Sequence, residues 1–423
     1  MYKLIYIIIT SLLAIFLPII KIFNKKLKSR FKDEKNQYIN ALSKLSGNNK
    51  KIIWLHAASS GEFEQVVPIL EKIDREKYFI LLSFMSPTIF DIEKNNQLAD
   101  AVVYHPLDIF WKAKSFIKDF RPSYYILNRH DIWPNHIYLA KEMGVKVVII
   151  NLNLHINSLR LYWLFKNFNK QIFSNFDKIY LGTKRLKSAA SKLVNKNKII
   201  ITGDTRYNRV KSRKNKKNNL LPKKFQSTKN IIFGSIIESD YDLVFGGLHK
   251  KFPNGNSDLI SQNIGLIITP HETDEFTIKS IANILTEIKI EYQLYTELMN
   301  EKAESYPNTI IIDTVGILAD LYQYSRLSYV GAAFGAGVHN VLEPAVYGSL
   351  VSFGPNIFIL DEAIDLYEKG LATMVHHRDD FLDYLDFLDS EKKYNDIKLK
   401  LKAFVEKRTC DIEKMLKDIL DEN

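Results

Sequence analysis

Short runs of apolar residues recur along most of the chain, and amphipathic stretches separate them. The runs are rich in Val, Ile, Tyr and Phe and mostly lack strict alternation, which is typical of strands buried on both faces of a parallel sheet. The stretches between them, such as residues 63–76 and 107–120, have helical spacing. The first half is therefore predicted to be an α/β domain, with strands at residues 52–56, 78–84, 102–104, 124–127, 145–152, 178–181 and 198–202.

A second series of runs follows the basic and polar residues 205–229, at residues 230–236, 265–269, 292–295, 309–313, 327–333 and 350–353. It predicts a second parallel sheet with covering helices. The expected parts are an amino-terminal segment (1–35), a first domain (36–208), a basic linker (209–229) and a second domain with a closing tail helix (230–423). Ligands of open sheets bind beyond the carboxyl ends of the strands, so the default site is the cleft between the domains.

The amino-terminal segment has a different pattern. Residues 4–20 contain no charged residue, and as a helix they would be about 26 Å long, just under the roughly 30 Å of a hydrocarbon core. A basic cluster without acids follows, formed by Lys21, Lys25, Lys26, Lys28, Arg30 and Lys32. The positive-inside rule then predicts that the rest of the chain is cytoplasmic. A retained anchor, spanning the membrane or lying in its interface, is favoured over a signal peptide or a buried helix, because residues 16–20 are bulky.

Composition and charge narrow the possible partners. The chain has 423 residues, 46% of them hydrophobic and 25% charged, as expected for a globular protein. Its net charge of +11 points to nucleic acid, anionic lipid or a phosphorylated substrate. The excess lies mainly in the amino-terminal cluster and in residues 209–224, which fits a membrane flank and a solvated linker better than a nucleic-acid-binding face. The single cysteine, Cys410, excludes disulfide scaffolds and Cys-based zinc sites.

Polar residues follow the predicted strands of the first domain. The first run ends at His56 and leads into Ser59-Ser60-Gly61-Glu62, a tight turn whose N–H groups could hold an anion. Glu62 could be a general base, or a carboxylate that only stabilises the helix dipole. His56 could equally be a core histidine.

Two further strands are followed by cations. The run at 124–127 leads into Arg129-His130-Asp131, where Arg129 could clamp a carboxylate or phosphate, or form an ion pair with Asp131. The run at 198–202 leads to Arg206, which is either a cleft cation or the start of the basic linker.

Small residues follow the strands of the second half. They include Gly234-Ser235, Pro270-His271, Gly316 and a loop at 331–344 with several glycines. Glycine lets backbone amides approach a phosphate. The spacing matches neither the dinucleotide fingerprint nor a P-loop, so the loop alone is as consistent with a bare turn as with a ligand site. Glu343 is a candidate for ribose hydroxyls, and no set of residues has metal-ligand spacing.

The order of these motifs resembles that of the 3-deoxy-D-manno-octulosonic acid (Kdo) transferases of lipid A, glycosyltransferase family 30. The resemblance covers nearly the whole chain and rests on Ser59-Ser60-Gly61-Glu62, Trp133-Pro134-Asn135, Thr202-Gly203-Asp204, Gly316, His339-Asn340-Val341-Leu342-Glu343-Pro344 and Gly354-Pro355. It implies a GT-B fold, in which two Rossmann-like domains enclose the active site.

The resemblance also implies an activity. The family moves Kdo from CMP-Kdo to a lipid A precursor (lipid IVA) at the cytoplasmic face of the inner membrane, with inversion and without metal or cofactor. The partners are then CMP-Kdo, the lipid acceptor and anionic lipid, with no nucleic acid. Glu62 matches the family's catalytic base, and Arg129 and Arg206 match two groups that assist the transition state. Candidate substrate-binding residues are Ser60, Gly61, Asp131, Gly234, Ser235, Pro270, His271, Val315, Gly316, Ile317, Asn340, Val341, Leu342 and Glu343.

Three positions depart from the family pattern. Arg129 stands where the family has an acidic residue, and His271 stands where it has an Arg. Arg206 keeps the charge of the family's Lys but not its geometry. The alternatives are therefore another GT-B enzyme that acts on a sugar nucleotide such as a UDP-sugar, and a non-catalytic lipid- or nucleotide-binding relative; the presence of Glu62 argues against the latter.

Overall fold

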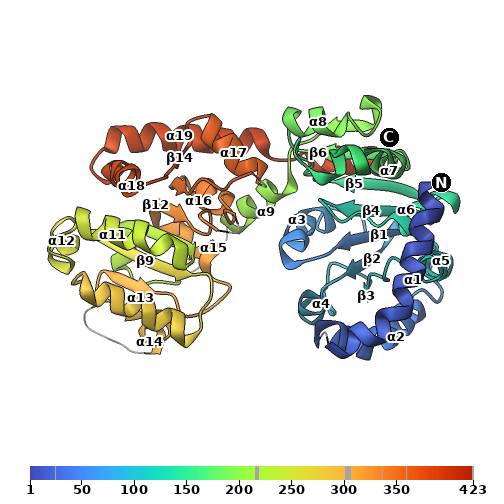
Figure 1. Ribbon diagram of the computed structural model, residues 1–423, viewed down its shortest axis with the longest axis horizontal. Helices are drawn as coiled ribbons and strands as arrows, with labels where there is room; N and C mark the ends of the chain where they lie inside the picture. Colours follow the sequence, from blue (N-terminus) through green and yellow to red (C-terminus); the bar gives the residue numbers. More distant parts are fainter. Residues whose placement is uncertain (24, 215–218, 301–305, 336, 359, 422–423) are drawn as a thin grey trace. The chain divides into compact units, whose positions relative to one another are not determined.

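A computed structural model describes the chain except residues 24, 215–218, 301–305, 336, 359 and 422–423. The chain forms two compact units, one of Met1–Arg209 with Arg408–Asn423 and one of Val210–Lys407. Each unit contains a seven-stranded parallel sheet with helices on both faces (Figure 1). The predicted α/β class with two parallel sheets is confirmed.

The sheet of the first unit has the strand order β3-β2-β1-β4-β5-β6-β7. Every run predicted for this half forms a strand, and the strands are β1 (Lys51–Ala57), β2 (Tyr78–Phe84), β3 (Ala101–Tyr104), β4 (Tyr124–Asn128), β5 (Lys146–Ile150), β6 (Lys178–Leu181) and β7 (Ile199–Ile201). The strand order reverses between β1 and β4, which pair directly. In open α/β sheets such a switch point is where ligands bind.

Helices bury both faces of this sheet. One apolar cluster contains residues of α3 (Ser60–Leu70), α4 (Pro87–Glu93) and α20 (Ile412–Leu420). A second cluster contains residues of α2 (Lys25–Ser43), α5 (Phe110–Phe120), α6 (Pro134–Glu142), α7 (Trp163–Phe173) and α8 (Lys184–Ala190). Strands that are covered on both sides need apolar residues at every position, which explains why the runs lack alternation.

The sheet of the second unit has the order β10-β11-β9-β8-β12-β13-β14. Its strands are β8 (Lys229–Ile236), β9 (Ile264–Pro270), β10 (Gln293–Leu294), β11 (Thr309–Ile311), β12 (Ser325–Val330), β13 (Leu350–Phe353) and β14 (Ala372–Met374). Strand β14 was not predicted, because this half-buried edge strand of three residues has too short a pattern. The switch point of this sheet lies between β8 and β12, which pair directly.

Helices cover this second sheet as well. They are α10 (Lys224–Ser227), α11 (Tyr241–Lys251), α12 (Asn256–Ser261), α13 (Glu275–Glu287), α14 (Tyr295–Asn300), α15 (Leu318–Leu321), α16 (Leu342–Tyr347), α17 (Asp361–Glu368), α18 (Arg378–Leu385) and α19 (Glu391–Arg408). The tail helix expected to close the second domain is divided between the units. Helix α19 lies in the second unit, whereas α20 buries Ile412, Met415 and Ile419 in the first, because its apolar residues share one face.

The basic stretch 209–229 has more structure than a solvated linker would. Helix α9 (Thr205–Lys214) carries its first part, and Arg209 of this helix contacts Glu64 at 2.6 Å. Leu221 and Phe225 are buried in an apolar cluster of the second unit. Their apolar character is hidden in the sequence by the many charges around them.

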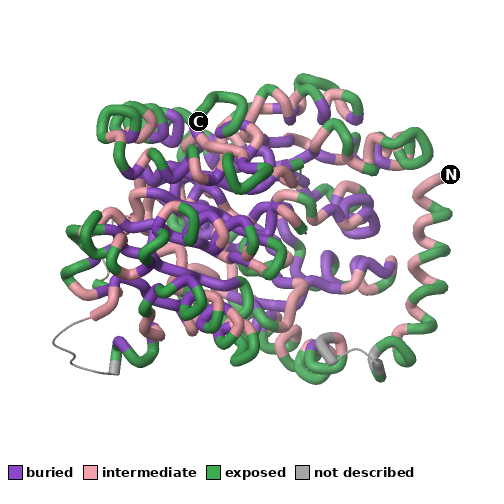
Figure 2. Tube along the Cα trace, turned by 60° about the vertical axis from the view of Figure 1, so that its left-hand side comes forward, coloured by how far each residue is buried: buried purple, intermediate pink, exposed green. Residues whose placement is uncertain are grey.

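The amino-terminal helix α1 (Tyr2–Phe23) is apolar and largely exposed. Its segment Tyr2–Ile20 has a mean hydropathy of 2.4 and is long enough to cross a membrane. None of its described residues is buried, as its pink and green trace shows (Figure 2). One side packs against α5 and α6. On that side Tyr6 Oη donates to Asp108 at 2.8 Å, and the Asn135 amide donates to Thr10 Oγ1 at 3.1 Å.

Arg30 is not part of an exposed basic flank. It is 2% exposed, donates to the backbone carbonyls of His105 and Met85, and lies 5.3 Å from the Tyr104 ring centroid. A guanidinium is buried only where acceptors satisfy it. The flank is thus smaller than the sequence suggested, although Lys28 and Lys32 are exposed.

Candidate functional site

Glu62 lies at the carboxyl edge of β1, in the first turn of α3. Ser59 caps this helix, and its Oγ accepts from Glu62 N at 3.4 Å. The Glu62 carboxylate turns back and accepts from Ala58 N at 2.8 Å. Burial raises the pKa of Glu62, and the charge of Asp131 raises it further, while Ala58 N–H, His56 and Arg129 act in the opposite direction. A carboxyl with a raised pKa is suited to proton transfer near neutral pH.

Arg129 and Arg206 lie at the same edge of the sheet. Arg129 follows β4 directly in a left-handed conformation (φ 59°), and its charge acts on Glu62. The amide of Gln65, one turn along α3 from Glu62, lies beside the Arg206 guanidinium. With its oxygen facing Arg206, Gln65 accepts two hydrogen bonds of 2.9 and 2.8 Å. The structure therefore brings the three predicted catalytic residues together.

A buried amide network that the sequence analysis missed supports this edge. Asn128 donates to the Glu62 carbonyl at 3.0 Å, and Asn151 donates to Asn128 Oδ1 at 2.9 Å and to Thr205 Oγ1 at 2.8 Å. Thr205 Oγ1 in turn donates to the Gln65 carbonyl at 2.6 Å. The network ties the ends of β4 and β5 and the start of α9 to α3. The sequence held a hint of this network, because Asn128 directly follows the apolar run 124–127 and Asn151 is a polar residue near the end of the run 145–152.

A buried histidine of β1 contacts Asp131. The Asp131 carboxylate contacts Nε2 of His56, which is fully buried at the end of β1. Burial alone would raise the pKa of Asp131, but the hydrogen bond and the charge of His56 outweigh burial and lower it. Asp131 therefore adds a negative charge next to Glu62.

The carboxyl edge of the second sheet is held by Asp240, which the sequence analysis also missed. Asp240 is fully buried and accepts hydrogen bonds from Ile237 N (2.9 Å), Ala332 N (2.9 Å) and Tyr329 Oη (2.8 Å). These bonds fix the turns after β8 and β12. A β-carbon on Gly331 would lie 2.8 Å from Asp240 Oδ2, so only glycine fits there.

Several of the predicted binding residues cannot contact a ligand through a side chain. A β-carbon on Gly234 would lie 2.0 Å from Tyr322 Oη, so this glycine makes room for packing. Ser235 has a left-handed backbone (φ 54°) at an irregularity between β8 and β9. Val341 and Leu342 are fully buried and could meet a ligand only through the backbone.

Histidines occupy the exposed part of this edge. Pro270 ends β9, and the His271 ring stacks on His339 with centroids 4.7 Å apart. Burial lowers the pKa of His339, and His271 lowers it further, against the charge of Asp240. The pair thus resists holding two positive charges unless an anion binds to it.

The remaining predicted binding residues surround short turns. Gly316 has φ 92° and open space around its α-carbon, and Val315 beside it is 76% exposed. Ile317 is the residue before α15. Just before α16, Asn340 Oδ1 accepts from Leu342 N at 3.1 Å, and the Asn340 amide donates to Glu343 at 2.8 Å. Within the described residues, no three His, Cys, Asp or Glu side chains are placed as metal ligands.

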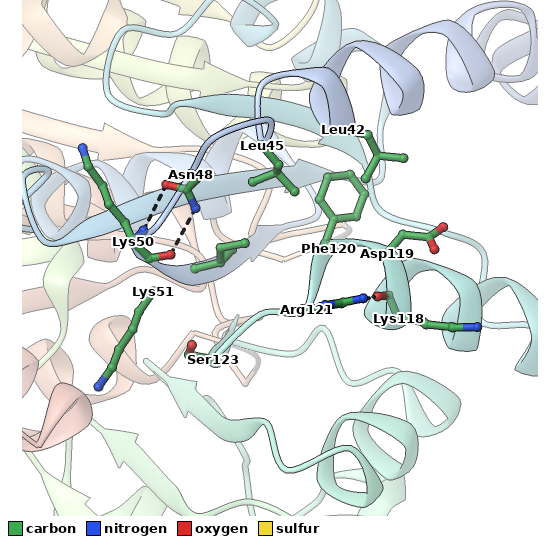
Figure 3. A pocket seen from close by; sticks show the side chains of 11 residues that line it. Leu42, Leu45, Asn48, Lys50, Lys51, Lys118, Asp119, Phe120, Arg121 and Ser123 are labelled. Carbon is green, nitrogen blue, oxygen red and sulfur yellow. Dashed lines mark hydrogen bonds between the residues drawn. The ribbon is translucent and has the colours of Figure 1, made fainter.

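A pocket at the opposite edge of the first sheet has no part in this arrangement. It has a volume of about 620 Å³ and lies where β1 begins and where Ser123 precedes β4 (Figure 3). Its cations are the surface residues Lys50, Lys51, Lys118 and Arg121. We therefore do not assign it to the candidate site.

Comparison with solved structures confirms the fold class. The structure of UDP-GlcNAc 2-epimerase from Neisseria meningitidis bound to UDP-GlcNAc aligns over 88% of this chain and 100% of that one, with a TM-score of 0.62 and 13% identity. A glycosyltransferase from Rickettsia africae aligns over 89% and 100%, with a TM-score of 0.56 and 13% identity. At such identities the similarity shows the fold alone, which is of the GT-B type.

Similarity in sequence narrows the class of protein further than similarity in fold does. The 3-deoxy-D-manno-octulosonic acid transferase of Chlamydophila psittaci is 27% identical over 331 residues, covering 76% of this chain and 72% of the relative. The enzyme of the same name from Aquifex aeolicus is 26% identical over 375 residues, covering 87% and 94%. Residues 25–209 match the family described as 3-deoxy-D-manno-octulosonic-acid transferase (kdotransferase).

These matches identify the chain as a glycosyltransferase. More closely, it is similar to the Kdo transferases, through the family model over residues 25–209 and through relatives that are 26–27% identical over most of its length. The resemblance seen in its motifs is thereby confirmed, whereas the roles of single site residues stay predictions.

Proposed function

We propose that the protein transfers Kdo from CMP-Kdo to a hydroxyl of a lipid A precursor, with inversion, by direct displacement. The acceptor hydroxyl loses its proton to Glu62, its oxygen bonds to the anomeric carbon, and the bond from that carbon to the CMP phosphate breaks. CMP carries a single phosphate, so backbone N–H groups and cations can stabilise it, and the proposal includes no metal. A single base is sufficient for inversion.

The observation that carries the proposal is the environment of Glu62. Its carboxylate lies at the switch point of the first sheet with a raised pKa, close to Arg129 and to the edge that holds Arg206. A carboxylate that only stabilised the helix dipole would not require Arg129 or Arg206 nearby. In the second unit, the turns at Ser235, Gly316 and Asn340 are the proposed CMP-Kdo site.

The first prediction tests Glu62. Glu62→Gln keeps the shape and the bond from Ala58 in one orientation but cannot accept a proton, so the transfer rate should fall by about 10²–10⁴-fold. The measurement is mass analysis of product from CMP-Kdo and a tetraacylated lipid A precursor, with CMP-Kdo affinity by calorimetry. Donor affinity should be unchanged.

The matched control is Glu64→Gln, which removes a carboxylate of the same helix that contacts Arg209 at 2.6 Å. It should keep normal transfer. Near-normal turnover of Glu62→Gln would reject the base, and release of UDP from a UDP-sugar in place of CMP would favour the other class of GT-B enzyme.

The lipid acceptor implies membrane attachment, and α1 is the proposed contact. Its polar residues Tyr6 and Thr10 bond to the first unit, while the large apolar residues Ile8 and Leu12, each about half a turn further along, are 50% and 54% exposed on the other side. A spanning helix would carry these polar contacts into the hydrocarbon core at high cost. We therefore propose that α1 lies in the cytoplasmic interface of the inner membrane, where anionic lipid attracts Lys28 and Lys32.

The second prediction tests this attachment. Ile8→Asp with Leu12→Asp should abolish sedimentation with anionic vesicles and lower transfer to vesicle-embedded acceptor about tenfold, while transfer to detergent-dispersed acceptor changes little. Deleting residues 1–23 should have the same selectivity. The control is Ile92→Asp, which charges an apolar residue on α4 that is 68% exposed. Equal losses on both forms of the acceptor would contradict the anchoring role.

A further inference from the structure

A buried histidine lies behind the proposed base, and the proposed function gives it no role. His56 is fully buried in β1. Its Nδ1 lies 2.9 Å from the carbonyl oxygen of Ser83 on β2 and 3.0 Å from Ser83 Oγ. Its Nε2 contacts the Asp131 carboxylate. A ring with partners at both nitrogens has a fixed orientation.

The partners determine how many protons the ring holds. The Ser83 carbonyl can only accept, so Nδ1 carries a proton when it bonds to that oxygen. Nε2 faces a carboxylate, which also accepts, so Nε2 carries a proton as well. In this state the ring is an imidazolium, and its pair with Asp131 is neutral overall.

The other possible state has a different charge. Ser83 Oγ accepts from Trp54 Nε1 at 2.8 Å and keeps its own proton, which it could donate to Nδ1. The ring would then be neutral, and the pair with Asp131 would carry one negative charge. Where the Ser83 hydroxyl instead donates to the Leu55 carbonyl, 3.5 Å away, Nδ1 carries its own proton and the pair is neutral.

The charge of this pair matters because of Glu62. Two carboxylates that lie close together in a partly buried site resist being ionised at the same time. Asp131 acts on Glu62 in this way. A base must be ionised before it can take a proton. The other titratable and charged groups around the cluster are His105, Tyr125, Arg129, His130 and Arg160.

We propose that His56 is a positioning residue for the transfer reaction: it holds Asp131 and offsets its negative charge, so that Glu62 stays ionised beside it. The inference rests on the proposed role of Glu62 as the base. It assigns His56 a task that a core histidine would not have, because a ring that donates to both the Ser83 carbonyl and the Asp131 carboxylate carries a second proton.

The pH profile of kcat/KM tests this role with the full chain, CMP-Kdo and detergent-dispersed acceptor. His56→Gln leaves the Asp131 charge without its counter-charge, so the acid limb should move to higher pH by about one unit. Asp131→Asn removes the charge, so the limb should move to lower pH. The double variant should return close to the wild type. Opposite shifts are not expected from a purely structural role.

The outcomes separate the two proposals. If His56→Gln leaves the acid limb in place, or if both variants move it in the same direction, the role of His56 is wrong while Glu62→Gln still lacks activity. If Glu62→Gln is active, the proposed function itself fails. Thermal unfolding and CMP-Kdo affinity check that the variants are folded. Should His56→Gln not fold, Asp131→Asn decides alone, since an unchanged or raised limb would overturn the inference.

Discussion

The carboxyl edges of the two sheets use different chemistry. The first edge gathers ionisable side chains that are buried or half-buried, namely Glu62, Asp131 and His56. The second edge is built from turns, and its buried carboxylate, Asp240, accepts from three donors. Asp240 is thus fully used in holding those turns.

The difference corresponds to two tasks. A group that moves a proton must change its charge, so its environment must keep both charge states accessible. A site that holds a phosphate needs fixed dipoles and close backbone approach, which small residues provide. In the proposed function, the first edge takes the reacting hydroxyl and the second takes the donor. Substitutions at the first edge should therefore lower the transfer rate, whereas substitutions at the second should weaken donor binding.

The third prediction concerns the backbone of the second edge and has the largest expected effect in this comparison. A β-carbon in Gly331→Ala would lie 2.6 Å from both Ile236 Cα and Ser235 O. The backbone must shift, so the free energy of unfolding should fall by about 1–3 kcal/mol. Moving these turns should also weaken CMP-Kdo binding more than tenfold. Chemical denaturation and calorimetry measure the two effects.

The control for Gly331→Ala is Gly61→Ala at the first edge, where a β-carbon meets nothing within 4 Å. Its stability should stay within about 0.5 kcal/mol of the wild type. If Gly331→Ala binds CMP-Kdo as tightly as the wild type, the donor site is not at this edge.

The fourth prediction concerns side chains of the second edge. His271 is the exposed member of the histidine stack, and a protonated imidazole can make a charge-assisted bond to phosphate. His271→Ala should weaken CMP-Kdo binding about tenfold, with little change in kcat. His249→Ala, at an exposed position on α11, is the control; equal affinities of the two variants would contradict the assignment.

The two edges also differ in how far the sequence predicted them. Apolar runs gave thirteen of the strands, and the turns after them gave Glu62, Arg129 and Arg206, because continuous runs and their polar ends are local patterns. The residues that hold these turns were not predicted. Asp240, Gln65 and Thr205 act across elements that are distant in the chain. No local pattern distinguishes such a residue from a surface one.

His56 and Arg30 illustrate the same limit. His56 could equally have been a core histidine, and only its contact with Asp131, 75 residues away, distinguishes the two roles. Arg30 looked like one of several flanking cations, but the carbonyl of His105 binds it inside the unit. In both cases the partner determined the role, and the partner was known only from the fold.

The fifth prediction has the smallest effect and concerns the folding stability that is lost by holding an ionised Glu62 at the first edge. The raised pKa of Glu62 means that the folded protein resists its ionisation. This penalty is absent below the pKa of the unfolded chain, where Glu62 is protonated in both states, and it is complete above the raised folded value. Glu62→Gln should therefore stabilise the protein at neutral pH, and the gain should vanish as pH falls below the ordinary range of glutamate. Thermal unfolding across pH 3.5–8 measures it, with Glu64→Gln as reference. A variant that is less stable than the wild type at neutral pH would show that the bond from Ala58 outweighs burial, and that Glu62 serves the helix more than the reaction.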